Sequence, residues 1–247
     1  MKQLKKILQL LLINKKGIGT ILFGPAKGLK MYNIALGQIF NRYEPNLLNI
    51  INKYVNKDDI VFDVGANRGY ITLVLSKAVG NSGMVYSFEP IPSTFNKLSN
   101  TISLNLLKNI SLNNFALSNN TERVIFNLLP EDDSTASMVW HTNNQKATKI
   151  EVDCVKLDFD DNLKNLKPNF IKIDVEGSEN KVIEGMLGLI NNCKPIIYTE
   201  VSELGREFVW NNLQKIGYSC FSSENETKIE NFNKYFHGDF LWIYNKS

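Results

Sequence analysis

The chain has 247 residues, of which 43% are hydrophobic and 21% are charged, and its formal net charge is +3. This composition is typical of a globular protein with one sizeable α/β domain, and so small a net charge does not favour nucleic acid as a partner. The three cysteines, Cys154, Cys193 and Cys220, lie far apart without a CxxC pair. They indicate neither a disulfide framework nor a zinc site, and they fit a reducing, cytoplasmic compartment.

Residues 1–42 predict a helical appendage or lid, followed by a main domain over residues 43–247. The opening MKQLKKILQLLLINKK has an apolar run that Gln9 interrupts, no small-residue cleavage site, and too little length to cross a bilayer. We interpret it as an amphipathic helix that packs on the domain or lies on a surface. Seven lysines precede the first acid, Glu44, so the segment is either a solvated basic helix or a weak contact for an anionic membrane face or an acidic substrate.

From residue 43 to residue 118 the pattern alternates between helices and strands. Helices are predicted over 43–55, 69–80 and 93–107, and strands over 60–64, 83–90 and 110–118. The run IVFDV is apolar without polar alternation, as in a strand that is covered on both faces. The order strand–helix–strand–helix–strand predicts an α/β fold with a doubly wound, mostly parallel sheet.

The middle of the chain is less regular, and the alternation then returns. Strands over 122–128 and 148–155 flank a polar loop over 130–147, of a kind that often covers a ligand site. After the loop, strands are predicted over 170–175, 195–201, 218–223 and 238–244, with helices over 178–190 and 205–217.

The stretch VFDVGANRGY, residues 61–70, is a strand that ends in an acid and continues into a glycine-rich turn and a helix. Gly65 leaves room for a ligand against the backbone. Gly69 stands where a helix begins, and the first N–H groups of a helix have no partner within it. The spacing Asp63-x-Gly65-x-Asn67-x-Gly69 is not the G-x-G-x-x-G pattern of dinucleotide sites. Because Asp63 would repel a pyrophosphate, we expect it to face a cationic amine, directly or through water.

Glu89 ends the next predicted strand, twenty residues beyond Gly69. An acid at this place binds the two hydroxyls of a ribose. A ligand with a ribose, an amino group and no phosphate is S-adenosylmethionine. A plain tight turn would explain the glycines alone, but not the order of Asp63, the glycines and Glu89.

The stretch IKIDVEGSE, residues 171–179, puts acids directly after another buried strand. Asp174 and Glu176 are interpreted as functional, whereas Glu179 suits the first turn of a helix. Glu200 ends the strand after that and is expected to face the same crevice. The acids predict a site at the carboxyl ends of the strands.

Together, VFDVGANRGY, FEP, ALS and IKIDVEGSE, with VKLDFD and the TE at 199–200, resemble the FkbM family of S-adenosylmethionine-dependent methyltransferases. The resemblance covers roughly residues 43–203. It implies the class I methyltransferase fold, a seven-stranded sheet with the last strand antiparallel. It also implies O-methylation of a sugar, a glycan or a natural product.

The resemblance also assigns residues to the cofactor. Asp63, Gly65, Ala66, Asn67 and Gly69 would surround its methionine half, and Asn67 stands where many methyltransferases have a glycine. The remaining assignments are the ribose to Glu89 with Pro90, the adenine to Asn114, Phe115 and Ala116, and the meeting point of methyl group and acceptor to Asp174.

A hydroxyl acceptor must lose a proton, and the candidate bases are Asp174, Glu176, Glu200 and His141. The three acids could instead hold Mg²⁺, although we expect no metal. Alternatives to an O-methyltransferase are N-methylation, a methyltransferase-like binding module without catalysis, and a Rossmann-type oxidoreductase. The sequence does not identify the acceptor or the oligomeric state.

Overall fold

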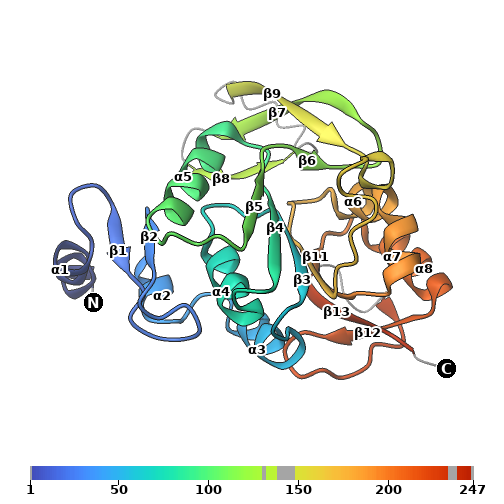
Figure 1. The fold of residues 1–247 in the computed structure, drawn as a ribbon, viewed down its shortest axis with the longest axis horizontal. Coiled ribbons are helices and arrows are strands. Elements are labelled where there is room, and N and C mark those ends of the chain that lie inside the picture. Colours follow the sequence, from blue (N-terminus) through green and yellow to red (C-terminus); the bar gives the residue numbers. More distant parts are fainter. Residues whose placement is uncertain (1, 130–131, 138–147, 233–237, 246–247) are drawn as a thin grey trace.

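The structure is a computed structural model that describes residues 2–129, 132–137, 148–232 and 238–245. Within these residues a seven-stranded sheet forms the centre of the molecule, in the order β12–β13–β11–β10–β3–β4–β5 (Figure 1). Its strands are β3 (Ile60–Val64), β4 (Met84–Phe88), β5 (Ile110–Asn113), β10 (Phe170–Ile173), β11 (Ile196–Val201), β12 (Tyr218–Ser222) and β13 (Gly238–Tyr244). The strands from β5 to β11 pair in parallel, and β13 pairs antiparallel with β11 and β12. The predicted mostly parallel sheet is confirmed.

Helices cover both faces of this sheet (Figure 1). One face packs against α3 (Pro45–Tyr54), α4 (Tyr70–Val79) and α5 (Pro92–Ser103), and the other against α6 (Glu179–Gly185), α7 (Leu187–Cys193) and α8 (Arg206–Ile216). Val61 belongs to the first core and its neighbour Phe62 to the second. Because successive strand residues point to opposite covered faces, both must be apolar, which explains the uninterrupted apolar runs.

The N-terminal segment is helical only at its two ends. Between α1 (Lys2–Leu12) and α2 (Leu36–Ile39), β1 (Ile18–Thr20) pairs antiparallel with β2 (Lys30–Tyr32). The segment packs on α5, where the backbone N–H of Tyr32 donates to Thr101 and the side chain of Asn105 bonds both backbone groups of Lys30. Its Met31 and Ile39 join the core beside α4 and α5. No helix of the described residues has both the length and the apolar character needed to span a bilayer.

A second sheet borders one end of the first, in the order β6–β9–β7–β8. It contains β6 (Ala116–Leu117), β7 (Glu122–Leu129), β8 (Asp132–Ser137) and β9 (Thr148–Val155). The strands predicted on both sides of the polar loop are confirmed, but β8 occupies part of that loop. The single strand expected over 110–118 is wrong. The chain leaves the central sheet at Asn113, because Asn114 donates to the carbonyl of Glu89 and Phe115 packs on Phe88.

The helix predicted over 178–190 is two helices, α6 and α7, which meet at Met186. Gly185 lies against the carbonyl group of Ser118, so closely that a Cβ at this position would overlap it. The contact joins α6 to the residue that directly follows β6. The short helix η1 (Leu157–Phe159) lies beside α7, where Asp158 accepts hydrogen bonds from the backbone N–H groups of Gly188 and Leu189.

Candidate active site

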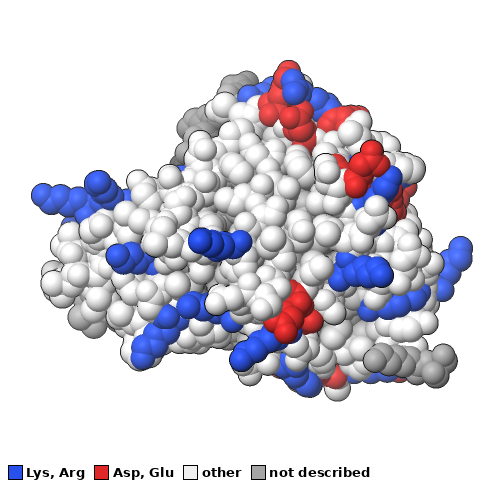
Figure 2. Space-filling view, viewed as in Figure 1, with Lys and Arg blue, Asp and Glu red and all other residues white. Residues whose placement is uncertain are grey.

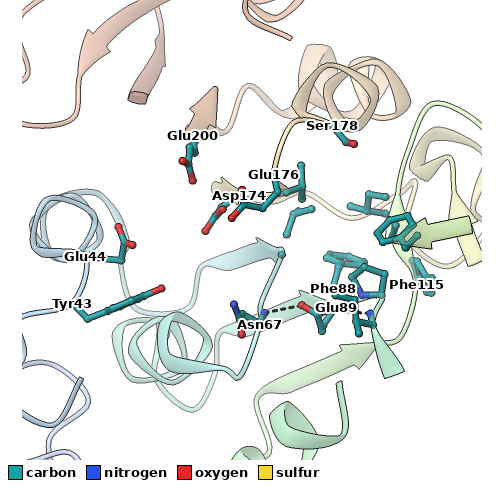
Figure 3. Close-up of a pocket in the computed structure, with 18 residues that line it drawn as sticks. Tyr43, Glu44, Asn67, Phe88, Glu89, Phe115, Asp174, Glu176, Ser178 and Glu200 are labelled. Atoms are coloured by element: carbon teal, nitrogen blue, oxygen red, sulfur yellow. Dashed lines mark hydrogen bonds between the residues drawn. The ribbon is translucent and has the colours of Figure 1, made fainter. Parts of the chain in front are cut away.

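A cavity of about 220 Å³ lies at the carboxyl ends of β3, β4, β10 and β11 (Figure 3). The second sheet contributes Leu117 and Phe126 to its wall, and the N-terminal side contributes Tyr43 and Glu44. Its lining also includes Gly65, Asn67, Glu89, Pro90, Phe115, Ala116, Asp174, Glu176 and Glu200, all from the stretches that the sequence singled out. The ends of parallel strands in doubly wound sheets are where such folds bind ligands.

The turn after β3 depends on its glycines. Gly65 has a φ of +78°, and a Cβ there would overlap the carbonyl oxygen of Asp174. Gly69 has a φ of +93° and precedes the first residue of α4. Asn67 has a φ of +51°, in the left-handed region that asparagine enters more readily than most residues. The turn therefore passes close under the cavity without side chains that would fill it.

Glu89 fastens this turn to the end of β4. One of its carboxylate oxygens accepts from the backbone N–H of Asn67 at 3.0 Å, and the other accepts from the N–H of Ile91 at 2.9 Å (Figure 3). Burial raises the pKa of Glu89 to about 7, although these two hydrogen bonds oppose the rise. Each oxygen keeps a second lone pair with which it can accept from a ligand hydroxyl.

Asp63 has a different neighbour from the one expected. Its side chain is fully buried and does not line the cavity. One oxygen accepts from the hydroxyl of Thr72 at 2.6 Å, and the other lies 3.4 Å from Nζ of Lys172. The cation that Asp63 faces is thus a lysine of the same chain, since Lys172 stands beside Asp63 in the β3–β10 register.

Lys172 is a site residue that the sequence reasoning missed. Its Nζ donates to the carbonyl of Gly65 at 2.7 Å and lies 3.3 Å from a carboxylate oxygen of Asp174. Burial opposes its charge, but Asp174 and Asp63 outweigh burial, and the pKa of Lys172 is raised. Lysine inside the otherwise apolar FIKI was the available signal, because an unpaired lysine is almost never buried.

Asp174 and Glu200 form the acidic end of the cavity. Burial, together with the charges of Asp174, Asp239 and Glu176, raises the pKa of Glu200 to about 8. The pKa of Glu44 is raised as well, by burial and by Asp239 and Asp174. Figure 3 shows the carboxylates of Glu44, Asp174 and Glu200 directed toward one space. No group of three or more His, Cys, Asp or Glu in the described residues has an arrangement that could hold a metal ion.

The opposite end of the cavity is apolar. The ring of Phe115 packs on that of Phe88 with 5.7 Å between centroids, and both line the cavity together with Ala116. Asn114 lies outside the lining, and its side chain donates to the carbonyl groups of Glu89 and Pro90. It therefore holds the wall of the cavity in place without forming part of it.

A second cavity, also of about 220 Å³, lies between the N-terminal segment and the glycine turn. Its lining includes Met31 and Gln38 from the segment and Ala66 from the turn. The two cavities share Tyr43, Glu44, Gly65, Asn67 and Asp174. The sequence favoured a packing role for Tyr43 over a sugar-binding one and gave no role to Glu44, whereas both line the two cavities. His141 lies outside the described residues.

The strand order, the antiparallel β13, the glycine turn after β3 and the acid after β4 define a class I methyltransferase domain. The methyltransferase FkbM domain model matches residues 63–234, so the chain belongs to the FkbM methyltransferase family. The cofactor of this domain is S-adenosylmethionine.

Two curated relatives are 26% identical to the chain. Methyltransferase 1 of Beauveria bassiana aligns over 147 residues, 52% of this chain and 59% of the relative. Hexuronic acid methyltransferase AglP of Haloferax volcanii aligns over 156 residues, 63% of this chain and 62% of the relative. The chain thus spans about three fifths of the length of the curated relatives that it matches.

Two solved structures share the fold. Methyltransferase FkbM from Methylobacillus flagellatus has a TM-score of 0.51 and 20% identity, over 76% of this chain and 44% of the other. A SAM-dependent O-methyltransferase from Thermotoga maritima has a TM-score of 0.50 and 13% identity, over 83% of this chain and 66% of the other.

Proposed function

We propose that the protein is an O-methyltransferase that methylates a hydroxyl group of a sugar, a glycan or a natural product. The proposal rests on the carboxyl groups of Asp174 and Glu200, which both line the acidic end of the cavity and are directed toward one space (Figure 3). A carboxylate whose pKa is raised to about 8 is a stronger base than an ordinary glutamate. It suits the removal of a proton from a hydroxyl near neutral pH.

The chemistry of the cavity supports one orientation of the cofactor. Glu89 offers acceptor oxygens to the ribose hydroxyls, and the rings of Phe88 and Phe115 offer apolar walls to the adenine. Asp174, at the other end, offers negative charge to the sulfonium. Gly65 and Asn67 line the cavity between these ends, where the bare turn leaves room for the methionine chain.

Asp63 takes a positioning role in this arrangement. It holds the buried Lys172, which in turn holds the carbonyl of Gly65 and the carboxylate of Asp174. Asp63 thus acts on the cofactor through Lys172, by fixing the turn and the acid that face the ligand.

When bound, S-adenosylmethionine supplies an electrophilic methyl group, so no covalent nucleophile of the protein is required. Glu200 accepts the proton of the acceptor hydroxyl. Asp174 raises the basicity of Glu200 through its negative charge. General-base assistance of this kind contributes about 10²–10⁴-fold to the rate.

The named activity of AglP, methylation of a hexuronic acid, supports a sugar as acceptor. The acidic end of the cavity favours a neutral sugar over a hexuronate, because the carboxylate of a hexuronate would add negative charge beside Asp174 and would oppose the ionisation of Glu200. The second cavity gives such a sugar room beside the polar side chains of Gln38 and Tyr43.

The test is methyl transfer from labelled S-adenosylmethionine to neutral glycosides, glucuronides, phenols and amines, with the methylated atom identified by mass spectrometry. We expect methylation of a hydroxyl, faster for neutral glycosides than for glucuronides. Glu200→Gln should lower turnover by about 10²–10⁴-fold and retain cofactor binding in calorimetry, whereas the exposed neighbour variant Glu203→Gln should leave both unchanged. Methylation only at nitrogen, or cofactor binding without transfer to any acceptor, would contradict the proposal.

A further inference from the structure

Helix α1 turns an apolar surface away from the rest of the molecule. Ile7, Leu10 and Leu11 lie on one side of the helix and are 52%, 75% and 74% exposed. Leu8 and Leu12 are only partly exposed, so the helix contacts the protein along one edge of its apolar face. The middle of that face has no partner within the described residues of the chain.

Exposed lysines surround this apolar face. Lys5 and Lys6 lie on α1, and Lys15 and Lys16 follow it directly. Lys27 and Lys30 are exposed further along the segment, and the sequence has no acid before Glu44. In the view of Figure 2, the lobe formed by the N-terminal segment shows basic side chains and no acidic ones.

We propose that α1 lies in the interface of a membrane that contains anionic lipids, with Ile7, Leu10 and Leu11 among the acyl chains. A helix with lysines on one side and exposed leucines on the other is the form that binds in the plane of an interface. Eleven residues, the length of α1, suit this position and do not span a bilayer.

The lysines and the exposed leucines of α1 together favour an anionic membrane over other binding partners. A second copy of the chain on the same face would bring two sets of lysines together, which like-charge repulsion opposes. A nucleic acid would neutralise the lysines and leave the leucines in water. An anionic membrane satisfies both groups, since its surface attracts lysines and its acyl chains accept apolar side chains.

The test is co-sedimentation of the full chain with vesicles of phosphatidylcholine, with and without about one third phosphatidylglycerol. We expect binding to the anionic vesicles, weakened by added salt, and little binding to the neutral ones. Leu10→Gln/Leu11→Gln should lower the partition coefficient at least about tenfold, and Lys5→Gln/Lys6→Gln about thirtyfold. All four positions are exposed, so the variants should fold.

The matched control is Leu106→Gln/Leu204→Gln, which removes two leucines that are 85% and 74% exposed elsewhere on the surface. It should bind vesicles as the parent does. A second readout is the fluorescence of Leu11→Trp, which should shift to the blue on anionic vesicles and be quenched by brominated lipid. Leu204→Trp should show neither change.

Three results would overturn the proposal. Equal binding of the parent and of Leu10→Gln/Leu11→Gln would show that the apolar face is not used. A dimer in light scattering that these substitutions dissociate would assign the face to a second copy. Displacement of the protein from vesicles by DNA without any loss in the leucine variant would assign the lysines to nucleic acid.

Discussion

The ammonium group of Lys172 lies 3.4 Å from the carboxylate of Asp63, and both side chains are almost completely buried. The pair connects two central strands, since Asp63 lies near the end of β3 and Lys172 stands opposite it on β10. Water does not reach Asp63, so its charge depends on Lys172 for compensation, whereas Lys172 also lies 3.3 Å from a carboxylate oxygen of Asp174.

Lys172→Met should therefore destabilise the protein strongly. The substitution leaves Asp63 as a buried charge without a partner, a change that typically costs roughly 3–5 kcal/mol. Urea unfolding at neutral pH measures this loss. In the matched double variant Asp63→Asn/Lys172→Met no buried charge remains at the pair, and the amide oxygen introduced at position 63 can still accept from Thr72, so most of the loss should disappear. A single variant as stable as the double would refute the pairing.

Glu200 predicts the pH dependence of turnover. A general base works in its ionised form, so kcat should rise about tenfold per pH unit below pH 8 and level off above it. Asp174→Asn removes a neighbouring negative charge, which should move the apparent pKa of kcat downward. Glu200→Gln should abolish the dependence. A profile that keeps its slope in Glu200→Gln would assign the base elsewhere.

Glu89 predicts the pH dependence of cofactor binding. Its pKa of about 7 means that the carboxyl is half protonated near neutrality, and the ionised form accepts hydroxyl hydrogen bonds more strongly. Cofactor affinity should thus fall as the pH drops below 7. Calorimetry at several pH values measures it. Glu89→Gln should bind about 10–100-fold more weakly at pH 8 and lose the dependence, whereas the exposed Glu207→Gln should not differ from the parent.

The same carboxyl has the opposite effect on the stability of the free protein. Because its pKa in the folded state is above the ordinary value, Glu89 favours the fold at low pH. This contribution is lost as the pH rises from about 4.5 to about 7. Relative to Glu89→Gln, the free energy of unfolding of the parent should decline across this window. A constant difference between the two proteins would contradict the raised pKa.

Substitutions at Gly28 and Gly65 can distinguish the cost of backbone strain from the cost of steric overlap. Gly28 has a φ of +86° with open space where a Cβ would stand, whereas Gly65 combines a φ of +78° with overlap on Asp174. Gly28→Ala should cost about 1–2 kcal/mol, the penalty of the left-handed conformation alone. Gly65→Ala should cost more and should also weaken cofactor binding, because the Asp174 segment must move. Thermal unfolding and cofactor titration measure both, and equal losses would refute the overlap.

Much of the fold could be predicted from the sequence, because apolar runs such as IVFDV and the helices between them report burial directly. The element boundaries were less accessible. The turn at Asn113 and the break at Met186 arise from contacts between distant segments, namely Asn114 with Glu89 and Gly185 with Ser118. Local patterning carries no trace of such contacts.

Part of the candidate site could also be predicted from the sequence. Glu89, Asp174, Glu176 and Glu200 end or follow strands, and parallel strands bring their carboxyl ends together. The partner of Asp63 was not predictable from its own motif, since the cation stands more than a hundred residues later in the chain. The roles of all these site residues in binding and catalysis stay predictions. The domain boundary after residue 42 also stays a prediction.

β13 lies between β11 and β12 although it follows both in the sequence. While the ribosome is still synthesising residues 238–244, the nascent domain has an open edge at β11, and β12 has no strand to pair with. Unpaired edges of this kind recruit other chains, so newly made protein is exposed to aggregation until β13 emerges. We therefore expect the protein to depend on chaperones during synthesis more than during refolding of a chain that already contains β13.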